Sequence, residues 1–177
     1  MTLPNNKNLS ELHLKCLHTD LFQWVQFCTN YDVELSKEVT QQTYLKIIEG
    51  IARYEKLSSL KTWLFGVARI TSLELLRDRK VHAIEELDRE SEQERDKEPA
   101  FVVSIDHFSK RAIASAIDEL SLMQREVIYL HFYKDFSLSE ISQVLGVTIG
   151  TVRTQYHRAK ARLNSLLNDW RPECKTN

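Results

Sequence analysis

Six polar side chains between Ile149 and Leu166 have the types that bind nucleic acids. They are Arg153, Gln155, His157, Arg158, Lys160 and Arg162. This stretch contains four Lys or Arg residues and no acidic residue. Arg and Gln side chains can hydrogen-bond base edges in a major groove, and Lys and Arg side chains can neutralise phosphates. Charge alone is also compatible with an ordinary solvated helix face, so the DNA-binding interpretation depends on the elements that position these residues.

The spacing of apolar residues predicts that the basic residues lie on one amphipathic helix. A buried stripe at i, i+4, i+7 and i+11 is expected from Val152, Tyr156, Ala159 and Leu163. Thr148 can cap this helix, and Gly146 can end the preceding one. The preceding helix begins with a capping box made by Ser137 and Glu140, and Ser121 with Gln124 is expected to form another capping box earlier in the chain. Helix, tight turn and helix at this spacing is the arrangement in which the second helix enters a major groove.

The second of these helices carries a family resemblance. The run from Gly146 to Arg153, continuing from His157 to Lys160, resembles region 4 of bacterial sigma factors. It is most similar to the extracytoplasmic-function (ECF) group of the sigma-70 family. Ser121 stands where that family often has Pro. The resemblance implies that an upstream promoter element is bound by Thr151, Arg153, Thr154, Gln155, His157, Arg158 and Lys160, with Thr151 and Lys160 at the phosphates.

A segment in the first half of the chain resembles region 2.2 of the same family. The run from Lys37 to Leu45 matches the segment that docks on the clamp coiled coil of RNA polymerase, with Glu38 in place of the usual Asp. The resemblance implies polymerase contacts from Glu38, Gln41, Gln42 and Leu45. From the residues alone, the same polar face indicates a solvated helix.

Three short runs in the expected helix at 60–80, namely Thr62–Leu64, Val67–Arg69 and Leu76–Arg77, resemble regions 2.3 and 2.4 of the family, which help to open the promoter. The resemblance implies contacts with the melted element from Tyr54, Lys56, Lys61, Trp63, Arg69 and Arg77. Aromatic and cationic side chains are the types that bind single-stranded DNA. A tryptophan in an apolar stripe is more often packed in the core, and this interpretation of Trp63 is favoured over a stacking platform. Ile70 departs from the family, which typically has Asn at this position.

Composition and patterning favour an all-α fold. Only four Gly and three Pro occur in 177 residues, too few for a turn-rich β fold. Helices are expected from a cap at 8–11 to about 28, and at about 36–54, 60–80, 108–120 and 122–132, after a frayed polar start at 1–7. We expect two small helical domains, a sigma region 2-like bundle at 8–80 and a region 4-like helix-turn-helix domain at 108–167. A flexible acidic linker at 81–107 joins them.

The formal net charge of −1 does not exclude DNA binding, because the charge is segregated. Eight acidic and three basic residues lie between Glu85 and Glu98, away from the basic helix. The sequence has no nucleophile–base motif or Gly-rich phosphate loop, so we expect no enzyme and no cofactor. Three dispersed cysteines indicate no metal site, and Cys16 and Cys28 are expected to be small core residues.

The implied function is a sigma factor that binds core RNA polymerase and directs promoter-specific transcription initiation. Family habit adds an anti-sigma factor as a partner. No apolar run approaches ~20 residues, so no membrane insertion is expected, and the cytoplasm is the expected compartment. Two alternatives remain open. The chain could be an autonomous helix-turn-helix regulator whose first half dimerises or senses a signal, or a helical adaptor that binds proteins and not DNA.

Overall fold

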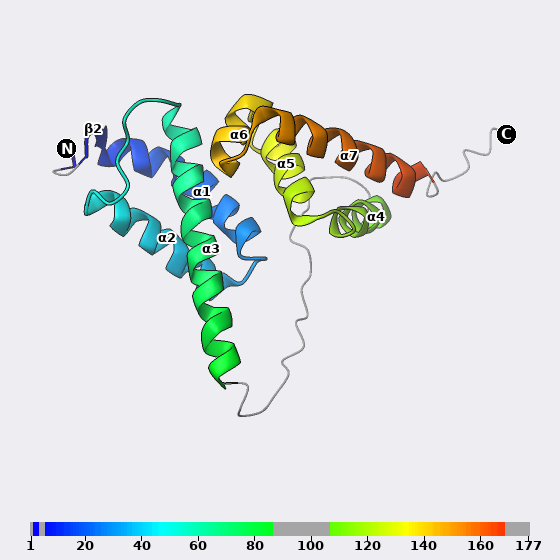
Figure 1. The fold of residues 1–177 in the computed structure, drawn as a ribbon, viewed down its shortest axis with the longest axis horizontal. Helices are drawn as coiled ribbons and strands as arrows, with labels where there is room; N and C mark the ends of the chain where they lie inside the picture. Colours follow the sequence, from blue (N-terminus) through cyan, green and yellow to red (C-terminus); the bar gives the residue numbers. More distant parts are fainter. Residues whose placement is uncertain (1, 4–5, 87–106, 169–177) are drawn as a thin grey trace. The chain divides into compact units, whose positions relative to one another are not determined.

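Helices carry almost all of the chain that this computed structural model describes, which is residues 2–3, 6–86 and 107–168 (Figure 1). The elements in chain order are β1 (Thr2–Leu3), β2 (Asn6–Ser10), α1 (Glu11–Cys28), α2 (Val33–Ile48), α3 (Leu60–Glu86), α4 (His107–Asp118), α5 (Leu122–Tyr133), α6 (Leu138–Leu145) and α7 (Ile149–Asn168). The predicted all-α class is confirmed. The chain forms two compact units, one built on α1, α2 and α3 and the other on α4, α5 and α7.

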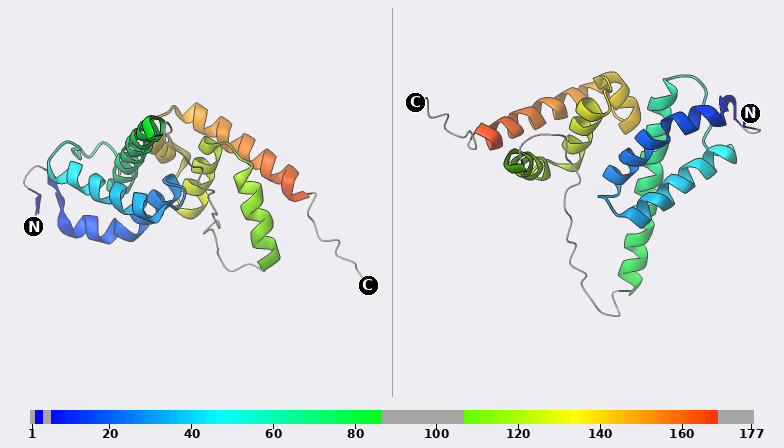
Figure 2. Two further views of the ribbon diagram at one scale, coloured as in Figure 1. Left: turned by 90° about the horizontal axis from the view of Figure 1, so that it is seen from below. Right: turned by 180° about the vertical axis from the view of Figure 1, so that it is seen from behind.

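The first unit packs its three helices around Trp24 of α1, which is fully buried. The Trp24 ring stacks on the Phe65 ring of α3 with 6.0 Å between centroids, and its Nε1 donates to the Phe65 carbonyl oxygen at 3.1 Å. The rest of this core includes Leu14, Leu21, Val25, Leu35, Val39, Ile47, Leu64 and Ala68. α3 crosses α1 and α2 in Figure 2, and each of the three helices packs on the other two. Each helix therefore turns one apolar stripe inward.

The second predicted helix, expected at about 36–54, has different bounds. It begins after Asp32, whose Oδ1 accepts a hydrogen bond from the Leu35 N–H at 2.9 Å. It ends at Ile48, because Gly50 adopts a left-handed backbone with φ of 78°. The apolar residues beyond it suggested a longer helix, but Ile51 is 70% exposed in the connecting loop.

The N-terminus and the linker also differ from expectation. β1 and β2 pair as antiparallel strands, where a frayed start was predicted. α3 continues to Glu86, so the first residues of the predicted linker are helical, and residues 87–106 lie outside the described part. Cys16 is exposed and Cys28 half-buried, so the expectation that both are core residues is wrong for Cys16. Within the described residues, no helix is long and apolar enough to cross a membrane.

The second unit packs α7 against α5 and α4. Its cluster consists of Leu120, Ile128 and Ala159, with Tyr156 and Leu163 packed on it. α5 starts with the predicted capping box: the Gln124 N–H donates to Ser121 Oγ at 3.4 Å, and the Ser121 N–H donates to Gln124 Oε1 at 3.1 Å. Packing on two helices fixes which side of α7 faces outward.

Candidate functional site

α6 is the first helix of the predicted helix-turn-helix, and its capping box forms as expected. The Glu140 N–H donates to Ser137 Oγ at 3.3 Å, and the Ser137 N–H donates to Glu140 Oε2 at 3.0 Å. Its apolar residues Ile141, Val144 and Leu145 are buried. The short α6 is thus specified at its start by two side chains and along its length by one apolar face.

The turn between α6 and α7 is closed by backbone geometry at Gly146. This residue has φ of 66°, and the Val147 N–H donates to the Ser142 carbonyl oxygen at 3.0 Å, as in a Schellman ending. Thr148 caps α7, with its Oγ1 accepting from the Thr151 N–H at 3.2 Å. The predicted stop and cap are both confirmed, and together they set the angle at which α7 starts.

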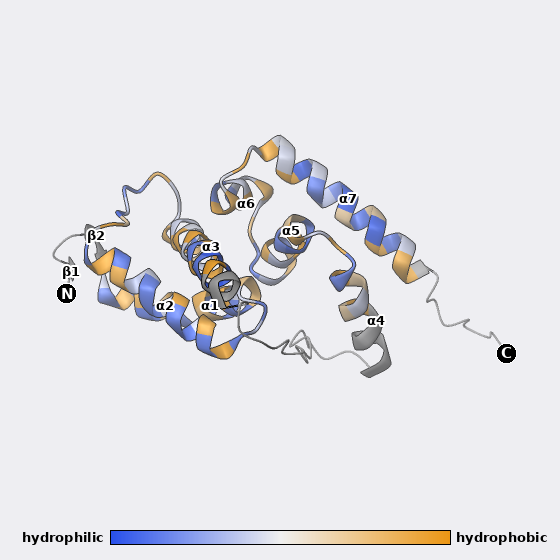
Figure 3. Ribbon diagram, turned by 60° about the horizontal axis from the view of Figure 1, so that its bottom comes forward, coloured by the Kyte–Doolittle hydropathy of each residue, from blue (hydrophilic) through white to orange (hydrophobic). Residues whose placement is uncertain are grey.

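α7 divides into a buried stripe and an outer face. Val152 and Ala159 have no exposed surface. At 100° per residue, the centre of the opposite face holds Thr154, His157 and Arg158. The two flanks hold Arg153 with Lys160 and Thr151 with Gln155. Of these seven residues, Thr151 and Gln155 are half-buried and the others are exposed. Hydrophilic residues cover the middle of α7 in Figure 3.

Some polar groups of α7 already have partners within the second unit. The Thr154 hydroxyl donates to the Gly150 carbonyl oxygen at 3.0 Å. Lys160 Nζ lies 5.5 Å from the centroid of the Tyr156 ring, a cation–π distance. Arg162 Nη2 lies 3.2 Å from Glu119 Oε2, so it connects α7 to the segment after α4. Arg162 therefore has a structural role that its place in the basic stretch did not indicate.

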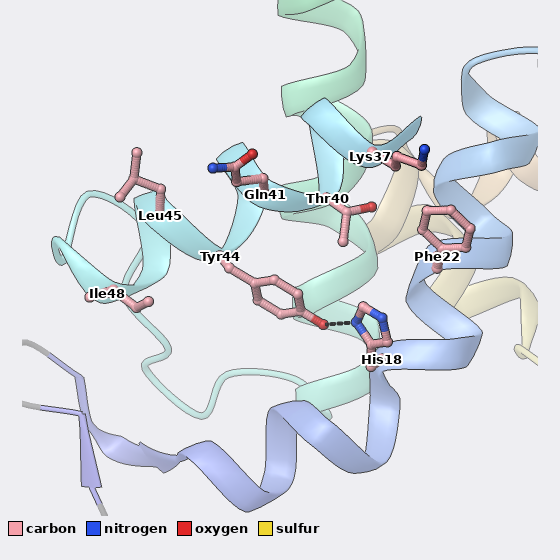
Figure 4. A pocket seen from close by; sticks show the side chains of 8 residues that line it. All are labelled: His18, Phe22, Lys37, Thr40, Gln41, Tyr44, Leu45 and Ile48. Carbon is pink, nitrogen blue, oxygen red and sulfur yellow. Dashed lines mark hydrogen bonds between the residues drawn. The ribbon is translucent and has the colours of Figure 1, made fainter. Parts of the chain in front are cut away.

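A groove of about 530 Å³ runs between α2 and α1 (Figure 4). Its lining residues are His18, Phe22, Lys37, Thr40, Gln41, Tyr44, Leu45 and Ile48. The predicted contact residues Gln41 and Leu45 come together here, whereas Glu38 and Gln42 are not among the lining residues. Leu45 and Ile48 are exposed apolar side chains beside polar ones. This combination suits an amphipathic partner helix.

The α1 side of the groove was missed by the sequence interpretation. His18 Nδ1 and the Tyr44 hydroxyl lie 2.9 Å apart, and their rings are 5.9 Å apart between centroids. Burial raises the pKa of the Tyr44 phenol, whose hydroxyl is protonated at neutral pH even without this shift. His18 and Phe22 are four residues apart and share a helix face, but no pattern in α1 alone shows that this face meets α2.

Glu38 lies outside the groove in an ion-pair cluster with α3. Arg79 Nη2 lies 2.9 Å from Glu38 Oε2, and Arg79 Nη1 lies 3.3 Å from Asp32 Oδ2. Asp32 is also the cap of α2. One guanidinium therefore holds both the first residue before α2 and a predicted contact residue on α2.

The loop before α3 brings two predicted aromatic residues together. The Tyr54 and Trp63 rings are 5.2 Å apart between centroids and tilted by 44°. The Tyr54 hydroxyl donates to the Ser58 carbonyl oxygen at 2.9 Å, which fixes the ring within the loop. Trp63 is half-buried, so the favoured interpretation of a core tryptophan holds only in part. Lys56 is exposed in the same loop with φ of 62°.

The remaining predicted residues of α3 do not all share one face. Trp63 and Arg77 are fourteen residues apart and lie on the same side of the helix. Lys61 lies elsewhere, with its Nζ 3.5 Å from Asp20 Oδ2 and 5.8 Å from the centroid of the Phe65 ring. Arg69 is half-buried and Arg77 is exposed. Packing against α1 therefore distinguishes Lys61 from Trp63 and Arg77 more clearly than the spacing in the sequence did.

Comparison with known proteins finds one family model that matches the second half of the chain and relatives that align with most of its length. A family model described as "Sigma-70, region 4" matches residues 110–163. The "ECF RNA polymerase sigma factor SigX" of Bacillus subtilis (strain 168) is 26% identical over 145 residues, covering 80% of this chain and 74% of that protein. The "ECF RNA polymerase sigma factor SigC" of Mycobacterium tuberculosis (strain CDC 1551 / Oshkosh) is 25% identical over 173 residues, covering 95% and 86%. The sigma factor RpoE, crystallised in complex with the anti-sigma factor NepR from Bartonella quintana, has a TM-score of 0.68 and 26% identity, covering 89% of this chain and 96% of that chain.

Proposed function

This chain belongs to the extracytoplasmic-function group of the sigma-70 family, and we propose which of its surfaces serve each step of the family's function. It is a sigma factor that binds RNA polymerase and promoter DNA and directs the initiation of transcription. It has no enzymatic activity of its own, because the chemistry of RNA synthesis belongs to the polymerase. The assignment of individual residues to these steps is the proposal.

The outer face of α7 is proposed to bind the upstream promoter element. Arg153, Thr154, Gln155, His157 and Arg158 would meet base edges, and Thr151 and Lys160 would meet phosphates. Support comes from the buried stripe of α7, which leaves Thr154, His157 and Arg158 at the centre of the outer face. Arg and Gln are suited to hydrogen bonds with bases in the major groove, and a bidentate contact discriminates by roughly 1–3 kcal/mol.

The groove on α2 and two polar residues of α2 outside the groove, Glu38 and Gln42, are proposed to dock on the polymerase. Gln41 and Leu45 would contact the polymerase from within the groove. The mixture of exposed apolar and polar side chains supports this proposal, because a partner helix can bury the former and hydrogen-bond the latter. The relative crystallised with an anti-sigma factor suggests that this chain is also regulated by one.

The loop before α3 and the exposed side of α3 are proposed to hold the melted promoter element. Tyr54 and Trp63 supply adjoining rings for stacked bases, and Lys56, Arg69 and Arg77 supply positive charge. Lys61 would contribute less, since its ammonium group is paired with Asp20.

We further propose domains at 8–80 and 108–167 with a linker at 81–107, and action in the cytoplasm, where bacterial RNA polymerase works.

The observation that carries the proposal is the capped helix-turn-helix with an acid-free outer face, in a chain whose relatives align over most of its length. The test mixes the purified chain with core RNA polymerase and measures run-off transcription from a library of random upstream sequences. A selected promoter family is expected. Its transcripts should fall sharply with Gln41→Ala, through polymerase binding, and with Arg153→Ala, through DNA binding.

Matched variants separate these roles from general damage. Gln23→Ala removes an exposed glutamine of α1 that does not line the groove, so it should leave polymerase binding unchanged. Tight binding of the chain alone to a palindromic site, with no binding to polymerase, would instead favour an autonomous regulator. Transcription that is indifferent to Arg153→Ala, with no DNA contact at α7, would favour a protein-binding adaptor.

A further inference from the structure

Ile70 of α3 is an exposed apolar side chain on a surface that the proposed function assigns to DNA. It is 56% exposed, and Leu73, nearly one turn later, is 43% exposed. Single exposed apolar residues are common and carry no information by themselves. The position of Ile70 between two proposed DNA contacts is what makes it informative.

Trp63, Ile70 and Arg77 lie seven residues apart in turn, so they form one row along α3. Seven helical residues rise by about 10 Å, which is the length of about three stacked nucleotides. A strand that reaches both Trp63 and Arg77 therefore passes Ile70. Glu74, which lies about one helical turn after Ile70, is held in an ion pair by Lys46 of α2, which reduces its repulsion of phosphates. Arg77 itself is exposed, with the neighbouring Asp78 carboxylate 3.7 Å from its Nε.

The chemistry of an isoleucine limits what it can recognise on a base. It has no side-chain hydrogen-bond donor or acceptor, so it cannot read the polar edge of any base. The apolar group that distinguishes one base from the others is the C5 methyl of thymine. We propose that Ile70, with Leu73 beside it, selects a thymine in the melted promoter element by contact with this methyl group. This inference rests on the proposed function, because it requires α3 to bind promoter DNA.

The experiment replaces each thymine of the melted promoter element, one at a time, with deoxyuridine, which lacks only the methyl group. Initiation is measured with polymerase reconstituted with the wild-type chain, Ile70→Val and Ile70→Asn. At one thymine or a few, the wild type should lose about fourfold in initiation, the size expected for removing one buried methyl group. Ile70→Val should keep this sensitivity. Ile70→Asn should transcribe thymine and deoxyuridine templates equally.

Leu12→Asn, at a 67% exposed position of α1, is the matched control and should behave as the wild type does. Thermal unfolding of all variants checks that these exposed substitutions leave the fold intact. Equal sensitivity to deoxyuridine in the wild type and Ile70→Asn would overturn the inference, as would no sensitivity at any position. If Ile70→Asn lowers the affinity for core polymerase and initiation falls equally on all templates, Ile70 contacts protein instead of DNA. That result would also overturn the inference. Absence of any promoter-dependent transcription would overturn the proposed function itself.

Discussion

The groove on α2 and the outer face of α7 present polar side chains in two different ways. On α2, the residues proposed to contact the polymerase have neighbours from other helices. Gln41 and Leu45 share a groove with His18 and Phe22 of α1, and Glu38 is paired with Arg79 of α3. On α7, polar contacts are mostly with residues of the same helix, such as Thr154 with Gly150 and Lys160 with Tyr156.

The difference shows that two surfaces of one protein can depend on different kinds of structural information. The α7 face follows from helical periodicity and two caps, so any change that keeps the helix and its buried stripe keeps the face. The α2 surface follows from how three helices pack, and it changes when that packing changes. The variants below test this difference, beginning with the largest expected effect.

Phe65→Ala should show the largest difference between the two surfaces, because it removes core packing beneath the α2 groove and leaves the α7 face unchanged. Phe65 is fully buried and stacks on Trp24, so its truncation should lower the free energy of unfolding of the first unit by about 3–5 kcal/mol. Polymerase binding through the α2 groove should weaken with it. Phe132→Ala, at a 56% exposed phenylalanine of α5, is the control and should cost far less. Similar losses for both variants in chemical denaturation would contradict the role given to the Trp24 core.

Arg158→Ala should lower promoter affinity about tenfold or more, because Arg158 lies at the centre of the outer face and a specific base contact contributes roughly 1–3 kcal/mol. Arg162→Ala deletes the same group four residues later, where the guanidinium is paired with Glu119, and should lower affinity less. Binding of the reconstituted polymerase to a selected promoter, measured over a range of salt concentrations, compares the two. Equal losses would mean that net charge, not position on the face, controls binding.

Arg79→Ala should have the smallest effect. Arg79, Glu38 and Asp32 all have side chains nearly half exposed, so water and salt screen their attraction. A double-mutant cycle of Arg79→Ala with Glu38→Gln should give a coupling of roughly 0.2–1 kcal/mol in stability, vanishing in high salt. Lys37, paired only three residues away with Glu34 on α2 itself, offers the matched intrahelical cycle. A coupling that persists in high salt would indicate a cluster far less screened than its exposure implies.

The sequence predicted most accurately what depends on neighbouring residues. The capping boxes at Ser121 and Ser137, the stop at Gly146 and the stripe of α7 are short-range patterns, and all of them are confirmed. The end of α2 was misplaced, because Ile51 and Ala52 continue an apolar pattern after Gly50 has turned the backbone. His18, Phe22 and the Arg79 cluster were not found, since pairings across 26 or more residues depend on helix packing that no local pattern encodes. The roles assigned to individual contact residues stay predictions.

The burial of Trp24 gives the first unit its own optical reporter. An indole enclosed by apolar rings emits at shorter wavelength than one in water, so loss of this core shifts the emission to the red. Of the three tryptophans, Trp63 also belongs to the first unit, and Trp170 lies outside the described residues. With Trp63 and Trp170 changed to Phe, the remaining emission would follow the first unit alone. Near-ultraviolet dichroism would follow both units, because the stacked Tyr129 and Tyr133 rings, 5.6 Å apart, contribute to it together with the aromatic rings of the first unit. Comparing the two signals during one melt reveals whether the halves of the chain lose structure together or one after the other.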